Sequence, residues 1–136
     1  MTRHGQGLLD TSTIIVFDRI KDPTQLPRQP MVSAITLAEL SVGPLVASDD
    51  ERVTRQIHLQ RTEADFDALP FDADAARAFG QVAVSLRRAG RKVSARTYDA
   101  MIAAIAISNG LPLYTCNPRD FQGIEGLEVV SVEVPR

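Results

Sequence analysis

The sequence contains one cysteine, no tryptophan and no long apolar run, and these shortages exclude several classes of protein. Cys116 is the single cysteine among 136 residues, so the chain has no internal disulfide and suits a reducing cytoplasm, where we expect it. The two histidines, His4 and His58, are well separated and make no zinc set with that cysteine. The longest apolar run, residues 100–107, has eight residues. A membrane span needs ~20, so we expect no membrane association, and no signal peptide is visible.

Several catalytic motifs are also missing. No G-x-G-x-x-G follows the first predicted strand and no G-K-S/T occurs, so dinucleotide and P-loop sites would lack their backbone cradle. An aspartyl-phosphate phosphatase would carry a second acid two positions after the first, and Ser12 stands there. No serine or cysteine has a histidine partner suited to nucleophilic catalysis. The net charge of -2 gives no general attraction to nucleic acid, so a polyanion would have to meet a local basic patch.

Strands and helices alternate along what remains. A composition of 44% apolar and 24% charged residues is typical of a folded globule, and we expect residues 1–136 to form a single domain. Predicted strands end near residue 9 and span 31–34, 69–71, 111–115 and 127–132; predicted helices span 12–20, 37–42, 48–68, 72–90 and 97–109. In this reading Thr36 caps the second helix, and Gly43-Pro44 ends or breaks it. The alternation predicts an α/β protein with a parallel sheet covered on both faces.

Four acidic residues are expected to meet at one edge of that sheet. Asp10 and Asp120 directly follow strands, and Glu39 lies about one turn into the helix after the second strand. Asp99 lies in the first turn of the helix that feeds the fourth strand, and a helix antiparallel to its strand would start at the same edge. Ligands of open parallel sheets bind outside the carboxyl ends of the strands. The spacing therefore favours an acidic pocket.

Carboxylates that converge without lysine partners repel one another unless a cation holds them. Oxygen ligands suit Mg²⁺ or Mn²⁺, which can activate water and neutralise phosphate charge for phosphodiester hydrolysis. Each acid also has a plain structural alternative. Asp99 and Glu39 suit the positive end of a helix dipole, Asp120 suits a turn, and Asp10 could be a helix cap.

Four blocks of the sequence resemble the signature blocks of PIN-domain proteins, most closely the VapC-type ribonuclease toxins of VapBC toxin–antitoxin pairs. The blocks are residues 8–12, 34–40, 96–106 and 113–121, in order and at suitable separations along nearly the whole chain. The resemblance implies a PIN-like, three-layer α/β/α sandwich with a central parallel sheet. It also implies a type II toxin with endoribonuclease activity, a Mg²⁺ or Mn²⁺ cofactor, a cognate VapB-like antitoxin and a homodimer.

By motif position, the resemblance assigns a catalytic role to all four acids. Asp10 and Asp99 match the main metal-binding aspartates, and Glu39 matches the glutamate that completes the site. Asp120 matches a late acid that holds the metal or its waters.

The resemblance also assigns supporting positions. Ser12 and Thr115 match hydroxyl positions that support the pocket by hydrogen bonding. Asn117 stands where some relatives carry another aspartate, and we group it with these supporting residues. Thr11 and Ser12 are expected to start the first helix and brace Asp10.

Basic residues near the acids are candidate contacts for RNA. Arg96 lies just before Asp99 and Arg119 adjoins Asp120, where cations would offset the repulsion between phosphates and carboxylates. Tyr98 is expected in the core or the pocket wall. Two other functions stay open at this point: a non-catalytic PIN-like module that binds RNA or protein, and a metal-dependent phosphatase acting on small molecules.

Overall fold

The fold is a parallel sheet between layers of helices. A computed structural model describes residues 4–136, and its five strands lie in the order β3-β2-β1-β4-β5 with every pairing parallel. The strands are β1 (Gln6–Leu9), β2 (Gln29–Ser33), β3 (Ala68–Leu69), β4 (Leu113–Thr115) and β5 (Val129–Ser131). The helices are α1 (Thr11–Val16), α2 (Ala34–Val46), α3 (Asp49–Asp65), α4 (Ala73–Arg88) and α5 (Thr97–Ser108). The predicted α/β class and covered parallel sheet are confirmed.

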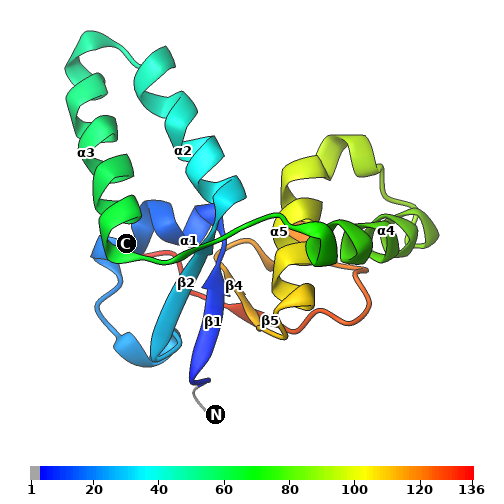
Figure 1. The fold of residues 1–136 in the computed structure, drawn as a ribbon. Helices are drawn as coiled ribbons and strands as arrows, with labels where there is room; N and C mark the ends of the chain where they lie inside the picture. The colour runs from blue at the N-terminus through cyan, green and yellow to red at the C-terminus, as the bar shows by residue number, and fades with distance from the viewer. Residues whose placement is uncertain (1–3) are drawn as a thin grey trace.

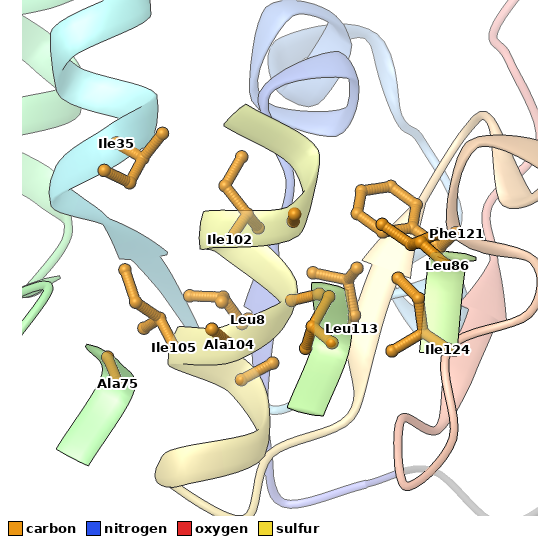
Figure 2. Packing of buried hydrophobic residues seen from close by; sticks show 14 residues of the cluster. Leu8, Ile35, Ala75, Leu86, Ile102, Ala104, Ile105, Leu113, Phe121 and Ile124 are labelled. Atoms are coloured by element: carbon orange, nitrogen blue, oxygen red, sulfur yellow. The ribbon is translucent and has the colours of Figure 1, made fainter. Parts of the chain in front are cut away.

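The central strand β1 divides the core, because successive side chains of a strand point to opposite faces. Leu8 packs in the cluster that contains the apolar residues of α4 and α5, whereas Leu9 packs with Ile14 of α1 on the other face. Figure 2 shows Leu8 beside Ile105 and Leu113 in the first cluster. Both leucines are completely buried, so the strand that carries Asp10 is fixed from both sides.

The helices α2 and α3 form a hairpin that projects away from the sheet (Figure 1). The helices α4 and α5 pack together on the other side of the sheet from this hairpin. The carboxyl ends of β1, β2 and β4 face the amino ends of α1, α2 and α5 at one edge. None of the described helices is long and apolar enough to cross a membrane.

Two helix boundaries differ from the sequence prediction. Ser33, rather than Thr36, caps α2, and its hydroxyl accepts a hydrogen bond of 3.1 Å from the Thr36 backbone N–H. The helix also continues through Pro44 to Val46. Proline lacks one backbone donor, yet Pro44 is buried and the Ala47 N–H still donates to the Gly43 carbonyl at 3.0 Å. The predicted stop at Gly43-Pro44 is therefore wrong.

Shorter corrections apply elsewhere. The predicted helix 12–20 is α1 followed by a 3₁₀ turn, η1 (Phe17–Arg19). Three further 3₁₀ turns lie outside the predicted helices and strands: η2 (Pro23–Gln25), η3 (Val93–Arg96) and η4 (Pro118–Phe121). Val53 and Ile57, which lie at helical spacing in α3, are 65% and 45% exposed. They are uncovered because α3 contacts the rest of the chain along one narrow stripe that includes Leu59 and Thr62.

Candidate active site

Asp10 is a buried carboxylate held by hydroxyl and amide donors. It follows β1, caps α1 and is only 4% exposed. Its Oδ1 accepts from the Thr13 amide at 3.0 Å and the Thr13 hydroxyl at 2.9 Å, and its Oδ2 accepts from the Thr115 hydroxyl at 2.6 Å. The Ser12 hydroxyl lies 2.8 and 2.9 Å from the two oxygens. Asp10 is thus a helix cap as well as a candidate ligand, and within residues 4–136 no Lys or Arg side chain pairs with it.

The supporting residues brace one another as well as Asp10. Thr115 is completely buried, and its hydroxyl accepts from the Asn117 backbone N–H at 2.9 Å. The Ser12 hydroxyl accepts from the Cys116 N–H at 3.3 Å. Asn117 therefore enters this network through its backbone, and its side chain is exposed. Sequence reasoning missed Thr13, although a hydroxyl residue three positions after a cap is placed to reach it.

Glu39 belongs to α2 and accepts a hydrogen bond from Thr11, a hydroxyl residue that was expected to brace Asp10 instead. The Thr11 hydroxyl donates to Glu39 Oε1 at 2.7 Å and lies 2.9 Å from the Thr36 hydroxyl. The expectation that Thr11 braces Asp10 is wrong. Thr11 is the first residue of α1, and its side chain extends toward α2, whereas Ser12 and Thr13 extend back toward the cap.

Asp99 lies in the first turn of α5, and the charges of the other three acids act on its carboxyl group. Burial, followed by the charges of Asp120, Glu39 and Asp10 in that order, together raise the pKa of Asp99 from 3.8 to about 6. Arg96 acts in the opposite direction. The fold therefore brings Asp10, Glu39 and Asp120 close enough to Asp99 to repel its carboxylate, and Arg96 offsets only part of that repulsion.

Asp120 and Arg96 form the edge of this cluster. Arg96 Nη1 lies 3.3 Å from Asp120 Oδ1 and 3.5 Å from the Asp120 carbonyl. A hollow of about 570 Å³ opens between α2 and η3 and is lined by Glu39, Ser94, Ala95, Arg96, Thr97, Tyr98 and Asp99. Tyr98 is 59% exposed, so it belongs to the wall of this hollow and is outside the core. Arg119 is exposed beside Asp120.

The donor set suits a divalent cation. Oxygen ligands predominate at this edge, and after burial the charges of Asp120, Glu39 and Asp10 raise the pKa of Asp99, a repulsion that a cation would relieve. In the described part of the chain, no group of three or more acidic, histidine or cysteine side chains is placed so that together they could hold a metal ion. An open arrangement is compatible with Mg²⁺, which usually binds through one or two carboxylates and retains several waters.

Comparison with known proteins shows which family the chain belongs to. Residues 8–127 match the PIN domain. The chain is 36% identical over 137 residues to Ribonuclease VapC5 of Mycobacterium tuberculosis, covering 99% of this chain and 98% of the relative. It is 38% identical over 96 residues to the tRNA(fMet)-specific endonuclease VapC of Shigella flexneri, covering 71% of this chain and 70% of the relative.

A solved structure agrees. The crystal structure of VapBC-5, a member of the VapBC family of toxin–antitoxin systems from Mycobacterium tuberculosis, matches with a TM-score of 0.80 and 36% identity, covering 94% of this chain and 99% of that chain. The family match spans every predicted acid, and the similarity to VapC5 extends over almost the full length of both proteins. This chain therefore belongs to the PIN-domain family, among the VapC ribonucleases of toxin–antitoxin systems.

Proposed function

We propose that this protein is the toxin of a type II toxin–antitoxin pair, and that it hydrolyses RNA phosphodiester bonds at the acidic edge formed by Asp10, Glu39, Asp99 and Asp120. The observation that carries the proposal is the convergence of the four acids: after burial, the charges of Asp120, Glu39 and Asp10 all act to raise the pKa of Asp99. Four neighbouring carboxylates repel the negative charge of an RNA phosphate, so the site needs a bound cation before it can act on RNA.

Asp10 and Asp99 would hold Mg²⁺ or Mn²⁺, Glu39 would complete the site, and Asp120 would hold the ion's waters. When bound, the ion supplies an activated water and neutralises charge on the scissile phosphate. Ser12, Thr13 and Thr115 keep the Asp10 carboxylate in one orientation by donating to it. Loss of such a supporting hydrogen bond typically lowers metal affinity or activity by about 10–100-fold.

Two arginines beside the acids are suited to bind RNA. Arg119 is exposed, and we assign it a phosphate contact. Arg96 uses Nη1 for Asp120, and in the described residues its other guanidinium donors make no hydrogen bond, so they remain available to a phosphate. Arg96 would then link the substrate backbone to an acid of the site.

A VapB-like antitoxin is the proposed protein partner. The α2–α3 hairpin exposes a set of large apolar side chains: Val42, Leu45, Val46, Val53 and Ile57. An apolar surface of this kind marks a protein contact, and we propose that the antitoxin covers it. We further propose that residues 1–136 form one PIN domain, that two copies form a homodimer, and that the protein acts in the cytoplasm, where Cys116 stays a thiol.

RNA cleavage tests the central claim. The purified chain is incubated with bulk tRNA, ribosomal RNA and messenger RNA in Mg²⁺ or Mn²⁺, then with EDTA, and in parallel as Asp10→Asn and as Arg28→Gln. The Arg28 substitution is the control, because that exposed residue precedes β2 at the opposite edge of the sheet. We expect cleavage by the wild type and the control, and none with EDTA or in Asp10→Asn. Cleavage that survives both EDTA and Asp10→Asn would contradict the mechanism, and RNA binding without cleavage would favour a binding module.

A further inference from the structure

Three hydroxyl groups that the proposed chemistry does not use lie in a row behind Glu39. The Ser33 hydroxyl is 3.5 Å from that of Thr36, the Thr36 hydroxyl is 2.9 Å from that of Thr11, and Thr11 is 2.7 Å from Glu39 Oε1. Ser33 and Thr36 are both 0% exposed. These are buried groups whose hydrogen bonds cannot be replaced by solvent.

Counting protons gives the row a direction. Each hydroxyl has one proton, and the ionised Glu39 carboxylate only accepts, so the Thr11 proton is committed to Glu39. The contact between Thr11 and Thr36 must then use the Thr36 proton, and the contact between Thr36 and Ser33 must use the Ser33 proton. All three protons therefore point toward Glu39, and aligned hydrogen bonds of this kind strengthen one another.

The row also joins two helices that each carry an acid. Ser33 caps α2 by accepting from the Thr36 amide, and Thr11 opens α1 directly after Asp10. The position of Glu39 is thus tied to the first turn of the helix that Asp10 caps. In the described residues, no donor reaches the second Glu39 oxygen, Oε2.

We propose that the Ser33–Thr36–Thr11 row positions the Glu39 side chain. The row donates a hydrogen bond to Oε1 and thereby leaves Oε2 free for a divalent cation or its water. The role of Oε2 rests on the proposed function, whereas the link between Thr36 and Glu39 does not. Thr36 is the key residue to test, because it is fully buried and its hydrogen-bonded path to Glu39 runs through Thr11.

The first experiment needs neither metal nor RNA. Tm is measured in EDTA for Thr36→Val, Glu39→Ala and the double variant of the full chain. Because either single change interrupts the same row, we expect the double variant to lose less Tm than the two single losses added together. Thr62→Val is the matched control, since Thr62 is also buried but donates to the His58 carbonyl, and its loss should add to that of Glu39→Ala. Additive losses for Thr36 and Glu39 would overturn the proposal.

The second experiment measures Mn²⁺ affinity by titration calorimetry of the folded variants. We expect Thr36→Val to bind Mn²⁺ about 10-fold more weakly, as is typical for loss of a supporting hydrogen bond. Thr36→Ser, which keeps the hydroxyl, should bind close to wild type, as should Thr62→Val. Equal affinity in wild type and Thr36→Val would overturn the positioning of the metal-facing oxygen.

The two experiments separate this proposal from the function on which it draws. If the wild type binds no Mn²⁺ and cleaves no RNA while Thr36 and Glu39 remain coupled in Tm, the proposed function fails and the row stands as a positioning device. If RNA is cleaved but the two residues show no coupling, the function stands and the row is rejected.

Discussion

The Thr115 hydroxyl donates a hydrogen bond of 2.6 Å to Asp10 Oδ2, although the two residues are 105 positions apart in the sequence. Thr115 ends β4 and Asp10 follows β1, and these strands are neighbours in the sheet. The candidate metal ligand is consequently complete only when the C-terminal third of the chain has docked. Both groups are buried, so no water stands ready to replace the bond.

Replacing Thr115 by valine should affect stability and activity together. The substitution keeps the branched shape but leaves the Asp10 charge without one donor, which should lower the free energy of unfolding by about 1–3 kcal/mol. RNA cleavage should fall about 10–100-fold, the range typical of residues that orient a ligand. Thr115→Ser, which keeps the hydroxyl, should retain most of both. Urea unfolding and a cleavage assay measure the two effects, and a fully active Thr115→Val would show that Asp10 needs no such support.

The raised pKa of Asp99 predicts how stability depends on pH in the absence of metal. The folded-state pKa of about 6 is above the ordinary value of 3.8, so the folded state binds more protons between these values. The charge penalty is complete above about pH 6 and disappears as the pH falls toward 3.8. The shift corresponds to about 3 kcal/mol at most, and screening by solvent reduces it to about 1–2 kcal/mol.

Asp99→Asn should therefore stabilise the metal-free protein while destroying its metal site. In EDTA at pH 7.5, the variant should exceed the wild type by about 1–2 kcal/mol in unfolding free energy, and the difference should shrink toward pH 4. Added Mn²⁺ should raise the Tm of the wild type but not of the variant. Urea titrations at the two pH values measure the first effect, and a variant that is less stable than wild type at pH 7.5 in EDTA would contradict the interpretation.

The locations of the acids could be predicted from the sequence, because each acid lies either just after a predicted strand or near the start of a predicted helix. Asp10 ends an apolar strand, and its arrival at one edge with Asp99 follows from parallel topology alone. The partner of Thr11 could not be predicted. A hydroxyl at the start of a helix can rotate toward either neighbouring acid, and the packing of α1 against α2 decides that it donates to Glu39.

Pro44 and Val53 show two other limits. Proline normally ends a helix, but α2 continues past Pro44 to Val46, because Pro44 itself is buried and the Ala47 N–H still donates to the Gly43 carbonyl. Val53 has helical spacing suited to a buried face, yet it is 65% exposed. Periodicity reports that a face is apolar, and it does not report whether the same chain or another molecule covers that face.

Arg119 should contribute to RNA binding through charge alone. Binding is measured in an Asp10→Asn background with a single-stranded RNA across a range of salt concentrations. Arg119→Gln should weaken binding at low salt and reduce the slope of log K against log salt by about 0.7, the value for one phosphate contact with a single strand. Arg28→Gln, at the opposite edge of the sheet, should leave the slope unchanged. An unaltered slope in Arg119→Gln would remove this residue from the RNA interface.

The exposed face of the α2–α3 hairpin should be needed for partner binding and not for folding. Leu45 and Val46 are 82% and 71% exposed, so serine at both positions removes little buried apolar surface and should change the free energy of unfolding by less than about 0.5 kcal/mol. If a VapB-like antitoxin covers this face, the double variant should still cleave RNA but should escape inhibition when the cognate antitoxin is added.

The control for this last experiment is Val84→Ser, which removes a 44% exposed apolar side chain from α4, away from the hairpin. It should remain fully inhibited by the antitoxin. Sedimentation analysis of the same proteins without antitoxin tests whether the hairpin instead joins two copies of the chain. A hairpin variant that becomes monomeric yet is inhibited normally would assign the face to the homodimer. A variant with unchanged mass and unchanged inhibition would show that neither partner uses this face, because a covered apolar contact loses affinity when serine replaces its central side chains.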